Sequence, residues 1–145
     1  MSLDGAYDDD NIFAKIVRGE IPSVKVWEDD QVLAFMDAFP QSRGHVLVIS
    51  KTSKARNLLD AETKTIGRLI GAVQKTARAV RAALNPDGLV VTQFNGAPAG
   101  QTVFHLHVHI IPRWEGVPLG RHAEGMADPE ELRALAAQIA ARLEG

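Results

Sequence analysis

Apolar side chains recur along this chain with two different periods. In residues 62–84 they return every three or four positions, which predicts one long amphipathic helix. The positions on this stripe are Ile66, Leu69, Ile70, Val73, Ala77, Val80 and Leu84. In residues 24–37, 45–50 and 89–95 apolar residues alternate with polar ones or follow one another directly, which predicts short strands. An acidic segment, residues 28–30, divides the first of these stretches into a hairpin.

Two shorter helices are expected near the ends of the chain. The first falls in residues 10–20, where Asp10 or Asn11 is the expected N-cap and Gly19 the expected end. The second falls in residues 128–143, where the helical pattern begins with the dipeptide Asp-Pro.

Composition and charge limit the classes to which the protein can belong. It has 145 residues, 46% hydrophobic and 23% charged, which predicts one globular domain. We expect residues 1–10 to form a flexible acidic leader and residues 11–145 the domain. The net charge is −2 without a separate basic block, so neither nucleic acid nor a membrane is an expected partner. Because the chain lacks cysteine, a signal-like start and a membrane-length apolar run, we expect a cytoplasmic protein.

Three of the five histidines stand at alternate positions in the stretch QTVFHLHVHIIPR, residues 101–113. Successive side chains of a strand point to opposite faces, so His105, His107 and His109 would share one face. This is the fifth strand that the sequence predicts. All connections between strands are short or contain the long helix. We therefore expect an α+β fold, an antiparallel five-stranded sheet with one long and several short helices.

A row of imidazoles on a strand has three interpretations. A solvated face is the first, although clustered titratable groups more often mark a functional site. A zinc hydrolase is the second. His105 and His109 would lie about 13 Å apart on a strand, so one zinc ion would take two neighbouring histidines and further ligands from elsewhere. Phosphate chemistry is the third, because histidine is a competent nucleophile at phosphorus.

The loop before the histidines favours phosphate chemistry. Gly96 and Gly100 allow backbone N–H groups to approach an anion closely. Asn95, Gln101 and Thr102 add uncharged donors. A glycine-rich loop alone is weak evidence, but this one leads directly into the histidines. The two features together indicate a phosphate site.

The same residues resemble the histidine triad (HIT) family, in its bacterial and Hint-like branches. The family pattern is H-φ-H-φ-H-φ-φ with φ apolar, and HLHVHII matches it at every place. The likeness includes the preceding loop, NGAPAGQT, and most of the N-terminal half, from IFAKIVRGEIPS to GHVLVISK. The resemblance implies a HIT-like fold and chemistry at a nucleotide phosphate.

The resemblance also implies a role for four histidines. His107 matches the nucleophile, which attacks the α-phosphorus of a nucleotide and forms a nucleotidyl-histidine intermediate. His109 would contact the phosphate and help proton transfer to the leaving group. His105 would orient the triad, and His45 would support it from the adjacent strand. No function is expected for His122.

The nucleotide would be bound by two sets of residues that match the family. The phosphate loop carries over as Asn95, Gly100, Gln101 and Thr102. The nucleoside pocket carries over as Ile12, Phe13, Ile16, Ile21, Phe35 and Asp37. A base needs apolar walls, and the Asp37 carboxylate is a suitable acceptor for a ribose diol. Ordinary core packing is an alternative role for the apolar residues.

One departure from the family concerns metal. Many bacterial relatives bind a structural zinc through a C-x-x-C and a later histidine. Asn11 and Ala14 occupy the cysteine places here, and Ser53 stands near the histidine place. We therefore expect no metal and no cofactor.

The leading hypothesis is a hydrolase or transferase that cleaves at the α-phosphate of a purine nucleotide conjugate. The conjugate would be a nucleoside phosphoramidate or a dinucleoside polyphosphate, and the sequence leaves both open. The alternative is a nucleotide- or partner-binding module with little turnover. The resemblance also implies a homodimer, formed through the long helix and a sheet edge.

Overall fold

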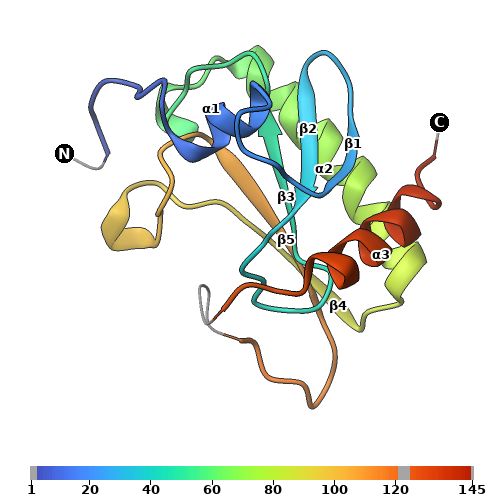
Figure 1. Ribbon diagram of the computed structural model, residues 1–145. Coiled ribbons are helices and arrows are strands. Elements are labelled where there is room, and N and C mark those ends of the chain that lie inside the picture. Colours follow the sequence, from blue (N-terminus) through green and yellow to red (C-terminus); the bar gives the residue numbers. More distant parts are fainter. Residues whose placement is uncertain (1–2, 121–124, 145) are drawn as a thin grey trace.

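A five-stranded antiparallel sheet forms the centre of the molecule, in the order β1-β2-β3-β5-β4 (Figure 1). A computed structural model describes residues 3–120 and 125–144. The strands are β1 (Lys25–Glu28), β2 (Val32–Met36), β3 (Val46–Ser50), β4 (Gly88–Thr92) and β5 (His107–Arg113). The expected α+β fold is confirmed. The evenly apolar β3 is the central strand, and each of its residues is buried.

Three α-helices accompany the sheet: α1 (Ile12–Val17), α2 (Thr63–Leu84) and α3 (Pro129–Ala140). Asn11, not Asp10, is the N-cap of α1, because its side chain accepts a hydrogen bond from the N–H of Ala14. Two 3-10 turns, η1 (Leu58–Asp60) and η2 (Ala97–Ala99), lie in the loops. None of the helices within the described ranges has the length and apolarity needed to cross a bilayer.

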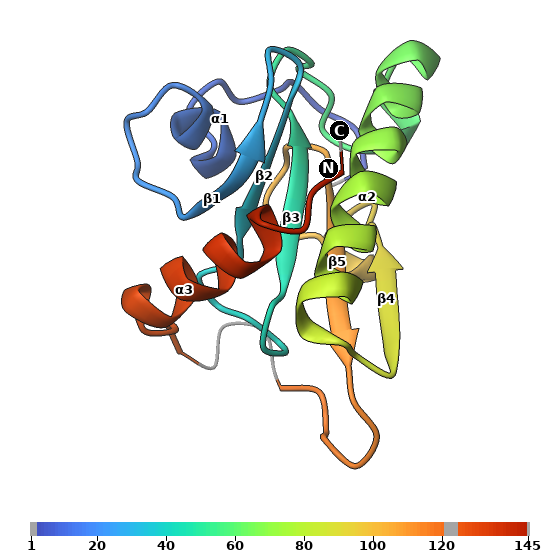
Figure 2. The same cartoon turned by 90° about the vertical axis from the view of Figure 1, so that its right-hand side faces the viewer.

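The two faces of the sheet have different partners. Helices α2 and α3 contact each other and cover the same face (Figure 2). The side chains of Val48, Val108 and Ile110 point into this core. Helix α1 packs on the opposite face, where Phe13 and Ile16 join a smaller cluster with residues from β2 and β3. The histidines lie on this second face, so the larger core supports the strands that carry them.

Helix α2 buries much of the stripe that its apolar residues predict, including Leu69, Val73 and Val80, but with one exception. Ile70 was expected on the core face, but it is 50% exposed. Thr76 is fully buried instead, where its hydroxyl donates to the carbonyl of Ala72 and accepts from Nε1 of Trp27. These two hydrogen bonds satisfy the buried hydroxyl of Thr76. Ala72 and Ala79 are also buried, and such small side chains allow a helix to pack closely on its neighbours.

Gly44 fixes the approach of the chain to β3, and we expect Gly44→Ala to destabilise the protein. Its φ is +87°, and a Cβ there would lie 2.3 Å from Cδ1 of Leu84 and 3.3 Å from Cγ of Pro112. Backbone strain and overpacking together should cost about 2–4 kcal/mol in urea unfolding. Gly116→Ala is the matched control, because Gly116 has a φ of +76° with nothing within 4 Å. Equal losses at the two sites would contradict the role of the Leu84 contact.

Candidate active site

The pairing of β3 with β5 places His107 and His109 side by side on the α1 face. In the antiparallel register Ile49 lies opposite His107 and Leu47 opposite His109. The two imidazole rings have centroids 5.0 Å apart, and each residue is 6% exposed. The predicted alternation therefore holds through this part of the strand. Strand β5 begins only at His107, and His105 lies in the bend before it.

The main chain determines which nitrogen of His107 carries a proton. Its Nδ1 lies 2.7 Å from the carbonyl oxygen of His105. A carbonyl oxygen can only accept, so Nδ1 must donate and the proton of the neutral ring resides there. Nε2 then keeps its lone pair. The ring of Phe13 meets this imidazole edge to face, with centroids 4.9 Å apart, and limits its rotation.

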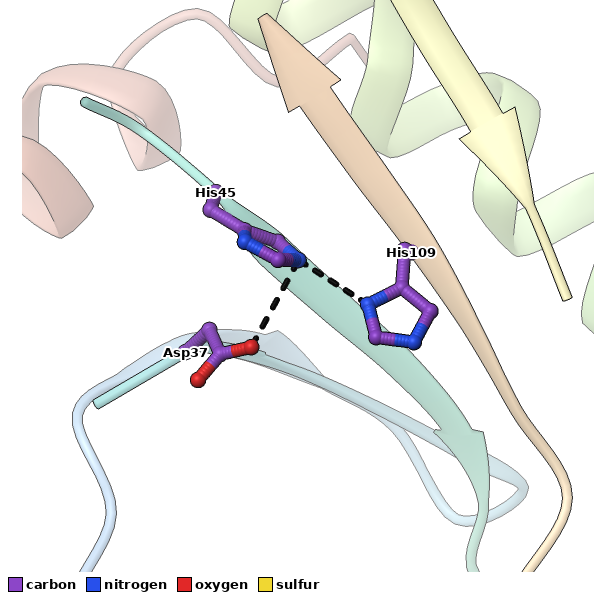
Figure 3. A group of neighbouring side chains, drawn as sticks. All are labelled: Asp37, His45 and His109. Carbon is purple, nitrogen blue, oxygen red and sulfur yellow. Dashed lines mark hydrogen bonds and ion pairs between the residues drawn. The ribbon is translucent and has the colours of Figure 1, made fainter. Parts of the chain in front are cut away.

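His109 has the opposite tautomer, as the result of a relay through His45 (Figure 3). The N–H of Gln41 donates to Nδ1 of His45 over 3.1 Å, so the proton of this fully buried ring lies on Nε2. Nε2 of His45 lies 2.9 Å from Nδ1 of His109 and donates to it. The remaining proton of His109 is therefore on Nε2. One imidazole of the pair offers a lone pair and the other a proton.

Asp37 lies at the end of β2 and belongs to the same cluster (Figure 3). Its Oδ2 is 3.5 Å from Nε2 of His45, and its Oδ1 accepts from the N–H of Phe39. The residue is 4% exposed. Its expected contact with a ribose stays a prediction.

Asp37, His45 and His109 are also the group that could hold a metal ion within the described chain. One ligand atom from each lies within 4.8 Å of the others. The two histidine nitrogens are at hydrogen-bond distance, and the proton relay accounts for their arrangement.

His105 is held by its two ring nitrogens and does not present them to the other triad members. Nε2 donates to the carbonyl of Ser50 over 3.0 Å, and Nδ1 accepts from the hydroxyl of Tyr7 over 2.7 Å. Burial lowers the pKa of His105 to about 4; the hydrogen bond to Ser50 opposes this shift and the neighbouring His107 adds to it. The ring is thus neutral at physiological pH, and its carbonyl is the group that serves His107.

The glycine-rich loop is closed by the side chain of Gln101. Gly96 and Gly100 adopt φ angles of +91° and +115°, which side chains rarely allow. Oε1 of Gln101 accepts from the N–H of Gly96, and its Nε2 donates to the carbonyls of Arg56 and Val103. Gln101 thus shapes the loop with its amide. The N–H groups of Gly96 and Gly100 donate inside the loop, and the contact of this loop with a phosphate stays a prediction.

Asn95 and Thr102 are the other two polar residues of the predicted phosphate loop. Asn95 accepts at Oδ1 from the N–H of Leu58 and from Gln93, which fixes its amide and directs Nδ2 elsewhere. Thr102 is exposed and directly follows Gln101. Asn95 Nδ2 and the N–H and hydroxyl of Thr102 have no hydrogen-bond partner within residues 3–120 and 125–144. These groups are suited to bind a phosphate.

The expected nucleoside pocket residues divide by burial. Phe13, Ile16 and Phe35 are buried in the smaller cluster, with Ile21 partly buried at its edge. Ile12 is 46% exposed. Phe13, Ile16 and Phe35 therefore have the alternative role of core residues, which pack beneath the histidines on the α1 face. Ile12 and Ile21 have surface left for a ligand.

The residues at the zinc positions of the family do not fit a zinc ion. The side-chain oxygen of Asn11 caps α1, Ala14 has no ligand atom, and Oγ of Ser53 accepts from the N–H of Ala55. None offers a thiolate or an imidazole, the usual ligands of structural zinc. His122 lies outside the described residues.

Comparisons with known proteins agree with the geometry. The HIT domain family matches residues 18–116, which is most of the chain. This chain belongs to the HIT family. The crystal structure of a Hit-like protein from Bartonella henselae is 54% identical, covers 96% of this chain and 100% of its own, and superimposes with a TM-score of 0.91. Protein hit from Bacillus subtilis is 44% identical over 91% of this chain and 93% of its own length.

Two relatives have names that state an activity. Adenosine 5'-monophosphoramidase hnt1 from Schizosaccharomyces pombe is 34% identical over 91% of this chain and 97% of its own length. Adenylylsulfatase HINT3 from Arabidopsis thaliana is 37% identical over 79% of this chain and 60% of its own length. Membership of the HIT family, with relatives so named, supports nucleotide hydrolase activity in general.

Two groups at this HIT site were missed by the sequence analysis. Tyr7, the only tyrosine of the chain, stands in a polar leader that has no pattern pointing to the histidines. Gln41 acts through its main-chain N–H, which every residue but proline has. Only the fold shows that these two groups meet histidine rings.

The low pKa of His105 predicts a pH dependence of stability for this HIT protein. Between pH 6.5 and about 4 the unfolded chain binds a proton at His105 that the folded chain does not. The free energy of unfolding should therefore decrease as the pH is lowered from 6.5 to about 4, and His105 alone should account for about 3 kcal/mol of this decrease. Above pH 6.5 the contribution is constant. Urea unfolding of wild type and His105→Asn at several pH values should show this difference; parallel curves would contradict it.

Proposed function

We propose that this HIT protein cleaves purine nucleotide conjugates at the α-phosphate, through a nucleotidyl-histidine intermediate on His107. The observation that carries the proposal is the opposite proton placement in two adjacent rings. His107 has its lone pair on Nε2 because Nδ1 donates to a carbonyl, and His109 has its proton on Nε2 because Nδ1 accepts from His45. A nucleophile and a hydrogen-bond donor at one phosphorus need this arrangement.

The proposed reaction has two displacements at phosphorus. In the first, Nε2 of His107 forms a bond to the α-phosphorus and the bond to the leaving group breaks, with its electron pair on the leaving group. The N–H of His109 donates a hydrogen bond to the departing atom and so helps it to take a proton from water. In the second, water attacks the phosphorus, the N–P bond returns its pair to His107, and the water proton passes to solvent. The products are the nucleoside monophosphate and the protonated leaving group.

The nature of the leaving group is less restricted than the centre of attack. The two relatives named above have names that refer to an amidate and to a sulfate attached to an adenylyl group. Both fit the same attack on the α-phosphorus. We propose nucleoside phosphoramidates and dinucleoside polyphosphates as the substrates to compare. A binding module with little turnover is the alternative, and formation of nucleoside monophosphate decides between them.

His107→Asn should abolish turnover and leave the fold intact, because the apolar face of β5 is unchanged. His109→Asn should keep part of the activity, and more of it for leaving groups that need no proton. Rapid quench of wild type with α-labelled substrate should trap label on the protein in an acid-labile, base-stable bond.

Similar modest losses of affinity in the two histidine variants would indicate a phosphate-binding row without catalysis. Inactivation of both with loss of a bound metal would indicate a metal site. Absence of the labelled adduct, together with near-normal turnover by His107→Asn, would contradict nucleophilic catalysis.

We also propose that the protein is a homodimer that pairs through α2 and the edge strand β4. Val91 lies opposite Ile110 in the register and so faces the same side of the sheet as α2, yet it is 50% exposed. Ile70 on α2 is equally exposed. Exposed apolar side chains beside an open sheet edge favour pairing with another chain. A second copy of this chain would cover the exposed apolar side chains and pair with the open sheet edge.

Light scattering at micromolar concentration should give a particle of about 31 kDa, twice the 15.7 kDa of the chain. Val91→Lys should shift it towards the monomer, since a charge would be placed at the proposed contact. Met126→Lys is the control, because Met126 is 70% exposed and lies on neither element. A monomeric wild type would disprove the dimer.

A further inference from the structure

The acidic leader lies against the body of the protein through polar contacts. The carbonyl of Leu3 accepts from Nδ2 of Asn57, and the carbonyl of Ala6 accepts from Arg56. Further along, Asp9 forms an ion pair of 2.9 Å with Lys54. These contacts place the leader over residues 54–57.

Tyr7 is the leader residue that reaches the triad. Its hydroxyl lies 2.7 Å from Nδ1 of His105, and the two rings have centroids 5.7 Å apart. Nε2 of His105 donates to the carbonyl of Ser50, so Nδ1 lacks a proton and must accept from the tyrosine O–H. Tyr7 therefore supplies the donor for a nitrogen of a residue that is 3% exposed.

The position of His105 bears directly on His107. The carbonyl of His105 accepts the proton of Nδ1 of His107, the contact that leaves Nε2 with its lone pair. His105 stands outside β5, in a bend that the sheet hydrogen bonds do not hold. Its side-chain hydrogen bonds to Ser50 and Tyr7 anchor this bend. The peptide that carries this carbonyl is also held by the N–H of Leu106, which donates to the carbonyl of Ala55 over 3.0 Å. A loss at either ring nitrogen of His105 would remove one of these three anchors and loosen the position of the carbonyl.

We propose that Tyr7 is a positioning residue of the active site: its hydroxyl fixes the ring of His105 and thereby the carbonyl that orients His107. This inference rests on the proposed function for its effect on rate, but the arrangement of the rings is independent of any substrate. It assigns the leader a part in the reaction, although the leader precedes the matched family region. Tyr7 acts through His105 and makes no contact with the reacting atoms.

The test uses Tyr7→Phe, which removes only the hydroxyl and keeps the ring beside His105. Asp9→Ala is the matched control, because it breaks the exposed leader ion pair with Lys54 and leaves Tyr7 unchanged. Nitrogen-15 NMR of the histidine rings should show Nδ1 of His105 losing its hydrogen bond in Tyr7→Phe. The Nδ1 proton of His107 should exchange faster with water. Both signals should keep their wild-type positions in Asp9→Ala.

The kinetic measurement should show a split between kcat and KM. We expect Tyr7→Phe to lower kcat about two- to tenfold, the effect of one lost hydrogen bond, and to leave KM nearly unchanged. Unchanged ring signals in Tyr7→Phe, or a kcat no lower than that of Asp9→Ala, would overturn the inference. A wild type that forms no nucleotidyl adduct would overturn the proposed function instead, and the ring signals would still decide the role of Tyr7.

Discussion

The chemistry of the site depends on the main-chain N–H of Gln41, which donates to Nδ1 of His45. That single donor fixes the proton of His45 on Nε2, and through it the proton of His109 on the nitrogen opposite the relay. If an acceptor stood in place of the Gln41 N–H, the proton of His45 would lie on Nδ1 and that of His109 would lie on Nδ1 as well. The loop that follows β2 therefore determines the polarity of a side chain on β5, with no charge change anywhere in the relay.

The two faces of the sheet have different roles: one packs the larger core, and the other carries the candidate catalytic side chains. One face is covered by α2 and α3 and contributes most of the buried apolar surface. The other carries the imidazoles and the small cluster around Phe13. Since neighbouring residues of β5 serve opposite faces, a rigid core lies directly behind His107 and His109. Their rings are held in place by strands that cannot shift without disturbing that core.

The features that the sequence predicted are those that follow from a periodic pattern of side chains. Alternation in residues 105–110 and the helical period of residues 62–84 follow from geometry that is the same in every protein. The proton positions could not be predicted, because they depend on where particular main-chain groups lie after folding. Ile70 shows the same limit in the core: the pattern marks it as apolar, but the neighbours of a helix decide which apolar residues are covered. The amide of Gln101 closes the loop, which the sequence pattern did not show, and its contact with a nucleotide stays a prediction.

The two reactive rings differ in the length of chain that each requires. The hydrogen bond that orients His107 joins residues 2 positions apart, whereas the one that orients His109 joins residues 64 positions apart. The first spans a short bend that Ser50 of β3 and Tyr7 anchor, and the second joins β3 to β5 directly. Both contacts therefore depend on the docking of β3 against β5. With β3 undocked, neither ring has a fixed proton position, so chemical competence itself reports that the sheet has closed.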